Sequence, residues 1–414
     1  MEPRHRHRAT GERPGRGGQP AGRALSSRAR SIDRRGLARG GGCAAGSAMK
    51  VAFYVHALAA TGVVRNVRLL AGDFHARGHD VTLVTALPGG EGVAGVPHHA
   101  LLARTGGSRM LQKWRAIPRL HAYLRRARPD ILLSAGNHGH LTALLGSRVV
   151  PGLRRIYRIS NDLRRAAPGT PGRLGGSLGR LLAIRLLAAD ADRLVLVSPT
   201  LAVGAFARAL AEGRAHVIEN AIDPAIARAC AIGPSPHGCY DDGVPVIVAI
   251  GRLAPQKNFG TLLTAFAQLR REGTVARLVI LGESRDRSQQ ALRAQADALG
   301  IGADLLLPGT VDNVFPWLTR AGAFVLPSWW EGSANVLLEA MALDVPVVAS
   351  RSAGNADSLL GQGRYGLLVD PSDPAAMAQA MARQIDPTRA IRPGDRIDAY
   401  RLDAMLNNWA RAIA

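Results

Sequence analysis

The chain has 414 residues, of which 47% are apolar, and a formal net charge of +22. This length exceeds one ordinary hydrophobic core and suits two domains. No run of about 18 apolar residues occurs, so the sequence predicts no transmembrane helix. Cys43, Cys230 and Cys239 are too few and too scattered for a disulfide framework or a metal cluster, which favours a reducing cytoplasm; pairing of Cys230 with Cys239 is the less favoured alternative.

The positive charge is concentrated in the first half of the chain. Residues 1–48 hold eleven arginines against three acidic residues, residues 49–230 hold 25 basic against 10 acidic, and residues 231–414 hold 17 against 18. A basic half favours an anionic acceptor or a membrane surface, with a coding bias toward Arg, Ala and Gly as the alternative. Only 18 of 414 residues are aromatic, and no basic–aromatic stacking platform occurs, so we expect no nucleic-acid partner.

Residues 1–48 form a separate, basic segment. They are rich in Arg, Gly, Pro, Ala and His, and they show no apolar period. Such a segment cannot bury enough surface to fold, and it lacks the apolar core of a secretory signal. Met49 then opens an apolar strand abruptly. We therefore expect a disordered extension and a true start at Met49, with a genuine basic tail as the alternative.

Residues 49–230 alternate strand and helix patterns. Apolar runs predict strands at 51–56, 81–85, 131–134 and 194–198, and a helix at 63–77 ends at Gly78, a natural C-terminal stop. Strands separated by helices indicate a parallel sheet with right-handed crossovers. These residues are therefore predicted to form a first Rossmann-like domain.

Residues 104–128 carry eight basic side chains interleaved with apolar ones. The apolar positions 110, 114, 117, 120 or 121, and 124 approximate one helical face, although Pro118 is expected to kink or divide the helix. Arginines between 154 and 165 would broaden the same basic surface. Such a helix can lie on an anionic membrane. The slightly favoured alternative is that its apolar face packs on the sheet and its arginines are solvated.

A turn-rich stretch at 223–244 predicts the domain boundary, with the second domain spanning residues 231–396. Apolar runs predict further strands at 246–250, 278–281, 305–307, 323–326 and 346–349. Residues 397–414 carry an apolar helical stripe that ends the chain. The sequence therefore predicts an α/β fold with two doubly wound Rossmann-like domains, whose ligands bind at the carboxyl ends of the strands.

Residues 331–341 read as a polar turn followed by a helix, directly after the predicted strand at 323–326. Two carboxylates, Glu331 and Glu339, stand eight residues apart. Ser333 or Asn335 is expected to cap the helix, whose free N–H groups would then point into the turn and suit a phosphate. Carboxylates beside a phosphate site suit sugar hydroxyls. A nucleotide sugar carries both groups.

The segment resembles the Glu-x7-Glu motif of the family 4 retaining glycosyltransferases, which have the two-domain GT-B fold. Further stretches match that family in order and spacing over roughly residues 245 to 385, and the first half matches more weakly. The strongest are Gly251-Arg252-Leu-Ala-Pro-Gln-Lys257-Asn258, Leu278-Val-Ile-Leu-Gly282, Val345-Pro-Val-Val-Ala349 and Tyr365-Gly-Leu-Leu-Val-Asp-Pro371. The resemblance implies two domains facing a central cleft and a retaining hexosyltransferase that uses no metal or other cofactor. It also implies that the terminal helix at 397–414 crosses back to the first domain, with packing on the second domain as the alternative.

The resemblance also assigns roles to individual residues on the donor side. Arg252 and Lys257 match the cations that bind the donor diphosphate, Glu331 faces the transferred sugar, and Glu339 binds the ribose. The remaining donor-side positions are those of two glycine loops and the helix start: Gly282, Gly309, Gly332, Ser333, Asn335 and Val336. Ser333 and Ala334 replace an aromatic residue and a Gly or Pro found in many members, so no side-chain role is assigned at those two positions.

The acceptor side is less well defined. His138 resembles a histidine that the family places near the donor sugar, with a turn residue as the alternative and His140 as its competitor. The resemblance makes it a catalytic candidate together with Glu331, Arg252 and Lys257. Gly62 lies in a turn that lacks the family's usual Gly-Gly, and Asn161 is a further cleft candidate.

The activity expected is transfer of a sugar from a nucleotide donor to a lipid-linked or polysaccharide acceptor of the cell envelope, with retention of anomeric configuration. The enzyme is expected in the cytoplasm, with peripheral contact to the inner face of the plasma membrane as a hypothesis. An epimerase or phosphorylase on the same fold is the alternative among enzymes. A nucleotide-sugar-binding subunit without turnover is the alternative outside them.

Overall fold

The computed structural model describes residues 48–59, 61–103, 106–164, 174–284 and 287–413. For residues 174–177 it describes the backbone only. The predicted disordered extension and Cys43 lie outside these residues. So do Arg104 and Arg165, which the sequence analysis counted with the basic surface. Cys230 and Cys239 are both free thiols.

The first domain is built on a seven-stranded parallel sheet with the order β3-β2-β1-β4-β5-β6-β7. Val, Ile and Leu dominate its central strands, because those strands are covered on both faces. The strands are β1 (Lys50–Val55), β2 (Asp80–Thr85), β3 (His98–Ala100), β4 (Ile131–Ala135), β5 (Arg154–Ile159), β6 (Arg193–Leu196) and β7 (Ala215–Val217).

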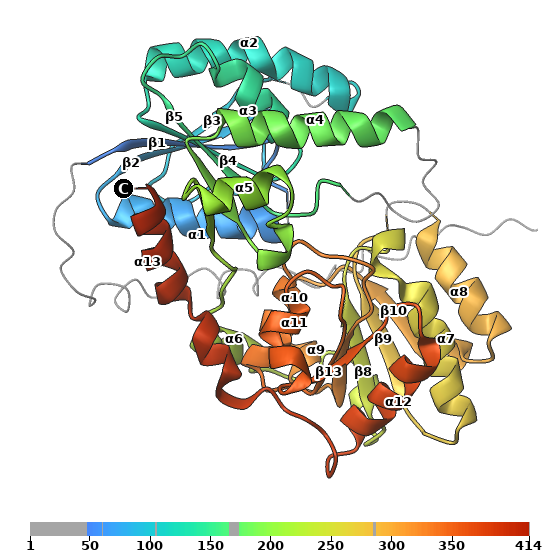
Figure 1. The fold of residues 1–414 in the computed structure, drawn as a ribbon. Coiled ribbons are helices and arrows are strands. Elements are labelled where there is room, and N and C mark those ends of the chain that lie inside the picture. The colour runs from blue at the N-terminus through green and yellow to red at the C-terminus, as the bar shows by residue number, and fades with distance from the viewer. Residues whose placement is uncertain (1–47, 60, 104–105, 165–173, 285–286, 414) are drawn as a thin grey trace, which may run out of the picture. The chain divides into compact units, whose positions relative to one another are not determined.

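Helices cover both faces of this sheet (Figure 1). Side chains alternate along each strand, so Val51 and Phe53 pack toward one helical layer while Ala52 and Tyr54 pack toward the other. The first layer holds α1 (Gly62–Ala76) and α13 (Leu402–Ile413). The second holds α2 (Arg109–Ala127), α3 (His140–Ser147), α4 (Leu174–Asp190) and α5 (Ala205–Ala211).

The sequence analysis missed the strands β3, β5 and β7 of this sheet, and its prediction for α2 was wrong. Strand β5 was not predicted, because three of its six residues are arginines and mask the apolar pattern. Helix α2 runs uninterrupted through Pro118, and it does not present the predicted apolar face. Leu120 and Leu124 pack on the sheet, whereas Met110 and Trp114 point to solvent.

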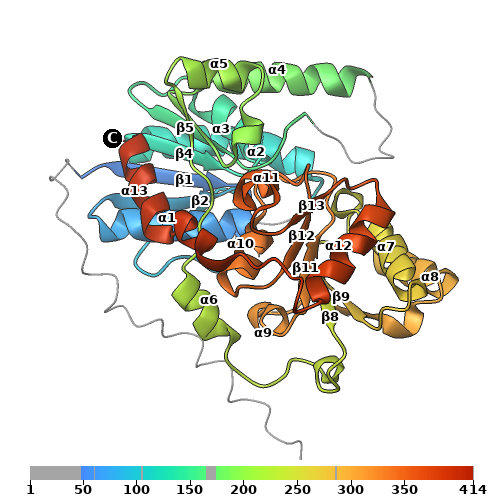
Figure 2. The ribbon, with the colours of Figure 1, turned by 60° about the horizontal axis from the view of Figure 1, so that its bottom comes forward.

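The second domain contains a six-stranded parallel sheet with the order β10-β9-β8-β11-β12-β13. Its strands are β8 (Val246–Ile250), β9 (Arg277–Leu281), β10 (Leu305–Gly309), β11 (Ala323–Leu326), β12 (Val347–Ser350) and β13 (Leu367–Val369). Helices α7 (Phe259–Arg271), α8 (Ser288–Ala298) and α12 (Pro374–Ile385) cover one face. Helices α6 (Pro224–Ala231), α9 (Phe315–Leu318), α10 (Asn335–Ala342) and α11 (Ala356–Leu359) cover the other (Figure 2).

The chain crosses between the domains at two adjacent places. Ile222 N–H donates to the Tyr400 carbonyl at 3.1 Å, and Ile222 and Arg401 form an isolated parallel bridge. Helix α6 lies within the turn-rich stretch and already packs in the second core through Ala227. After Tyr400 the chain returns, and α13 buries Trp409 in the core of the first domain.

Both strand orders reverse direction at one point, between β1 and β4 in the first sheet and between β8 and β11 in the second. In doubly wound sheets, ligands bind outside the carboxyl ends of the strands at this point. The loops that follow these four strands therefore carry the candidate site.

Candidate functional site

Lys257 and Glu331 form an ion pair in the second domain. Lys257 follows β8 and Glu331 follows β11, and Lys257 Nζ donates to Glu331 Oε1 at 2.8 Å. Ser328 Oγ donates to the same oxygen at 2.6 Å. The two charged side chains are only 14% and 11% exposed. Sequence reasoning gave them separate roles, toward phosphate and sugar, and the structure brings them into direct contact.

Hydrogen bonds fasten the two loops to each other. The Gln256 side chain donates to the Trp330 carbonyl at 2.8 Å, and Trp329 N–H donates to the Gln256 carbonyl at 2.9 Å. The buried amide of Asn258 donates to the Pro327 carbonyl at 3.0 Å. The Lys257–Glu331 pair is therefore held on a rigid base, while Arg252, nearer the strand, is exposed.

Helix α10 begins at Asn335, and its capping differs from the prediction. The N-cap is Ala334, and neither Ser333 nor Asn335 makes a side-chain cap. Instead, Asn355 Oδ1 accepts the Ala334 N–H at 3.1 Å. The Ser333 hydroxyl is buried and finds no hydrogen-bond partner in the part of the chain that the structure describes. The first turn of α10, with Val336, still places its amide groups at the carboxyl end of the sheet, where a phosphate would be stabilised.

Glu339 lies in α10, and its side chain is 8% exposed. It forms an ion pair with Arg65, a residue of α1 in the first domain. Sequence reasoning missed Arg65. Its place on α1, directly after the loop that follows β1, is the signal that could have found it. A ribose that binds Glu339 has to share or displace this guanidinium.

Glycines allow close approach of backbones at the site. A Cβ atom on Gly332 would stand 1.9 Å from the Ser160 carbonyl oxygen, and one on Gly62 would stand 2.5 Å from Asn335 Nδ2. Gly282 has a φ of +153°, and its N–H donates to the Gly309 carbonyl at 2.8 Å. Only glycine fits at 62 and 332 without displacing a neighbour.

His138 follows β4 and lies in a group of cations. Its Nε2 is 3.5 Å from Arg109 Nη1. The residue is exposed as a whole, yet partial desolvation of its ring, followed by the charges of Arg109 and Lys113, lowers its pKa to about 4. The charge of Arg252 contributes in the same direction, which places this imidazole within electrostatic reach of the donor-side loop. His138 is therefore neutral at physiological pH.

His140 and Asn161 are less suited to contact a ligand. His140 is buried, and its Nδ1 forms a hydrogen bond of 2.9 Å with Ser134 Oγ. Burial lowers the pKa of His140 to about 3. Asn161 Oδ1 accepts the N–H of Asp162 at 2.9 Å, and its carbonyl accepts from the Asn137 side chain. Both residues thus shape the loops of the first domain, and His138 remains the titratable candidate there.

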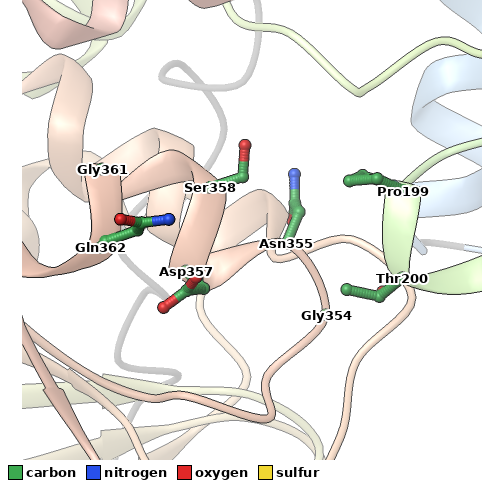
Figure 3. A pocket seen from close by; sticks show the side chains of 8 residues that line it. All are labelled: Pro199, Thr200, Gly354, Asn355, Asp357, Ser358, Gly361 and Gln362. Carbon is green, nitrogen blue, oxygen red and sulfur yellow. The ribbon is translucent and has the colours of Figure 1, made fainter.

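A cavity of about 500 Å³, lined mostly by residues with polar side chains, lies beside these groups. Figure 3 shows Pro199 and Thr200 on one side of it and the side chains of Asn355, Ser358 and Gln362 on the other. A smaller recess shares Thr200 and Gly354 with it and reaches Glu331; Arg164 and Arg351 line that recess. The smaller recess therefore reaches one member of the Lys257–Glu331 pair, and Glu339 lines neither of the two hollows.

The described residues contain neither a metal-binding cluster nor a membrane-spanning helix. No group of three or more His, Cys, Asp and Glu side chains is placed to hold a metal ion. No helix combines the length and the apolarity needed to cross a bilayer.

Comparison with known protein families gives two matches in chain order. Residues 60–226 match the family described as Glycosyltransferase Family 4, and residues 244–386 match the family described as Glycosyl transferases group 1. One match lies in each domain, and together they include every candidate site residue. The chain belongs to the family 4 glycosyltransferases. Its two parallel sheets are the GT-B fold that the sequence predicted.

Individual relatives agree with this assignment. The lipopolysaccharide core biosynthesis glycosyltransferase LpsE of Rhizobium meliloti is 35% identical over 137 residues, which is 33% of this chain and 38% of LpsE. The N-acetylgalactosaminyltransferase of Campylobacter jejuni that is named for a diphospho-undecaprenol acceptor is 31% identical over 140 residues, 34% of this chain and 37% of that protein. The matched stretch thus spans less than two fifths of either relative.

A solved structure supports the fold over a larger share of the chain. Anabaena HepE in complex with UDP-glucose superposes with a TM-score of 0.71 at 18% identity, covering 88% of this chain and 99% of HepE. At this level of identity the likeness concerns the fold alone.

Proposed function

We propose that this protein is a retaining glycosyltransferase that moves a sugar from a nucleotide-sugar donor to a lipid-linked or polysaccharide acceptor. The observation that carries the proposal is the grouping of Lys257, Glu331 and the start of α10 at the switch point of the second sheet. Cations and helix N–H groups suit a diphosphate, and the carboxylates of Glu331 and Glu339 suit sugar hydroxyls. HepE, which shares the fold, is described in complex with UDP-glucose.

The main catalytic contribution would be stabilisation of the departing diphosphate. As the bond between the anomeric carbon and the phosphate oxygen breaks, negative charge grows on that oxygen, where Arg252, Lys257 and the N–H groups of α10 can offset it. The acceptor hydroxyl forms the new bond on the same face of the sugar and gives its proton to the leaving phosphate oxygen. This front-face route needs no protein nucleophile and retains the anomeric configuration.

Donor binding would rearrange the two ion pairs of the site. Lys257 can reach a phosphate only by sharing its ammonium with Glu331, which is 2.8 Å away. Glu339 can accept from ribose hydroxyls only when Arg65 moves or is shared. The side chain of Arg65 is 44% exposed, which leaves room for its guanidinium to turn toward the nucleotide.

The test begins with a donor screen. Thermal unfolding with UDP-, GDP- and ADP-sugars should single out one nucleotide by a rise in melting temperature. With that donor, nucleoside diphosphate should be released only when a glycolipid or polysaccharide acceptor is added. Release without an acceptor, isomerisation of the sugar, or a sugar found covalently attached to the protein would each refute the mechanism. Binding with no turnover on any acceptor would favour the non-catalytic subunit.

The acceptor side suggests that the enzyme works at a membrane. Between residues 92 and 189 the chain has 17 Lys and Arg residues against two acidic residues. The helices of this region also expose large apolar side chains, which we call the apolar surface. Its members are Met110, Leu111 and Trp114 of α2, Leu141 and Leu145 of α3, Val149, and Leu178, Leu181, Leu182 and Leu186 of α4.

We propose that this apolar surface lies on an anionic bilayer, with the enzyme in the cytoplasm at the inner face of the plasma membrane. Apolar side chains would enter the interface while neighbouring arginines such as Arg109 and Arg115 meet lipid phosphates, each adding about 1 kcal/mol. Figure 1 shows α2, α3 and α4 together on one face of the first sheet. The enzyme would then reach a lipid-linked acceptor at the surface of the membrane that holds it.

Co-sedimentation with vesicles containing phosphatidylglycerol tests this contact on a protein that starts at Met49. Trp114→Ser with Leu178→Ser should reduce binding, and high salt should weaken it by screening the arginines. The matched control is Ile232→Ser with Val275→Ser, because those two side chains are at least as exposed but belong to the second domain. Equal binding by both double variants, or no binding at low salt, would refute the membrane contact.

A further inference from the structure

Arg158 is a buried cation that pairs with no acidic side chain of the described residues. It lies near the carboxyl end of β5, and it is 2% exposed. Among the described residues no carboxylate is recorded within ion-pair distance of it, and its Nη1 atom lacks a hydrogen-bond partner. Burial lowers its pKa only to about 10, so the guanidinium stays charged at neutral pH. An unpaired buried charge is expensive, and the fold by itself does not call for one.

Two side-chain amides connect Arg158 to the start of α10. Arg158 Nη2 donates to Asn220 Oδ1 at 2.6 Å. Asn220 Nδ2 in turn donates to Asn335 Oδ1, also at 2.6 Å. Asn335 is the first residue of α10, and its Nδ2 faces the turn at Gly62, 2.5 Å from where a Cβ atom on that glycine would stand. The chain of bonds thus begins in the core of the first domain and ends at the loops of the candidate site.

The direction of these bonds follows from the chemistry of the guanidinium. Arginine has five N–H donors and no acceptor, so Asn220 has to turn its oxygen toward it. The Asn220 amino group then faces Asn335, whose side-chain oxygen has to accept the hydrogen bond. The Asn335 amino group is left pointing away from the chain of bonds. With a group that can also accept in place of Arg158, both amides could turn over, and Asn335 would present its oxygen instead.

We propose that Arg158 is a positioning residue that fixes the Asn335 amide as a hydrogen-bond donor to the donor diphosphate. The inference rests on the proposed function, which places that diphosphate at the start of α10. An N–H group held there would add to the stabilisation of the leaving oxygen, whereas a carbonyl oxygen turned the same way would repel it. The charge of Arg158 would act through the two amides and make no contact with the substrate.

Asn220→Asp is the decisive variant. Its carboxylate would pair with Arg158 and relieve the unpaired charge, so the melting temperature should rise by a few degrees. A carboxylate cannot donate to Asn335, however, so the Asn335 amide should rotate until its amino group faces the carboxylate. Its oxygen would then face the diphosphate, and kcat should fall at least about 10-fold. Stability and activity would therefore move in opposite directions, which a purely structural role for Arg158 does not predict. Wild-type kcat in Asn220→Asp would overturn the inference.

A second pair of variants tests the direction of the bonds at Arg158 itself. Arg158→Lys keeps a donor-only group, and its kcat should stay within several-fold of the wild type. In Arg158→Gln the side-chain amide can rotate and present its oxygen, so kcat should fall about 10-fold or more. Arg155→Gln is the control, because Arg155 lies on the same strand but pairs with Asp190 and Asp192. Equal kcat values for Arg158→Lys and Arg158→Gln at equal melting temperatures would contradict the proposal.

Binding separates this inference from the proposed function. Suppose that the wild type binds a nucleoside diphosphate, and that Asn220→Asp shows the same affinity for it and the same kcat. The positioning role then fails and the proposed function stands. If the wild type binds none of UDP, GDP and ADP by isothermal titration calorimetry, both fail.

Discussion

Replacing Lys257 with Met should unfold the protein at a lower temperature as well as slow catalysis. The methionine keeps most of the aliphatic stem, which packs near Gly251, and removes only the charge. Glu331 would keep the Ser328 hydroxyl as a partner but lose its counter-ion. A lysine in a loop is usually solvated, and its replacement then has little effect on folding. The 14% exposure of this side chain changes that expectation.

The magnitude follows from the geometry. At 2.8 Å, and at an effective dielectric constant of about 20, the attraction between the two charges is about 6 kcal/mol, much of it offset by desolvation. Removing one partner of a buried pair costs about 3–5 kcal/mol, and the remaining exposure of this pair favours the lower end. At about 2 °C per kcal/mol, the melting temperature should fall by about 6 °C.

Thermal unfolding of three variants checks this estimate. Lys257→Met combined with Glu331→Gln should recover part of the loss, because the orphaned charge is then absent. Arg252→Met, at an exposed position, should leave the melting temperature unchanged while weakening donor binding. A melting temperature for Lys257→Met within 1 °C or so of the wild type would refute the reasoning that the pair is energetically coupled.

Two further predictions separate the remaining polar groups. Glu339→Gln should lower the affinity for the bare nucleoside diphosphate, whereas Glu331→Gln should spare that affinity and impair transfer; calorimetry and initial rates that show equal effects would mean that the two roles are wrongly divided. His140 has a pKa lowered to about 3 by burial and then by the Arg158 charge, while the unfolded chain binds this proton near the ordinary value of 6.5. The free energy of unfolding should therefore fall as the pH falls from 6.5 toward 3, and urea titrations should show a shallower fall in His140→Asn. Identical pH profiles for the two proteins would exclude that contribution.

The parts of the fold that the sequence predicts are those with a local cause. Continuous Val, Ile and Leu runs identify β8, β9 and β11, and the loops after them carry Arg252, Lys257 and Glu331. These features depend on residues close together in the chain.

Features set by distant partners could not be predicted in the same way. The Arg65–Glu339 pair joins residues 274 positions apart and depends on how α1 and α10 approach each other. The cap of α10 comes from Asn355, which lies outside the helix and its turn. Strand β5 was missed because a buried arginine contradicts the usual preference for apolar residues in a covered strand, and that same arginine leads to the inference about Asn335.

The most direct test of the site is a crystal structure of the protein with the nucleoside diphosphate that the donor screen selects. The diphosphate should lie between Arg252, Lys257 and the start of α10, with the ribose on Glu339 and Arg65 displaced from that carboxylate. A nucleotide found instead in the cavity between Thr200 and Gln362, with the Lys257–Glu331 and Arg65–Glu339 pairs both intact, would contradict the assignment of the donor site.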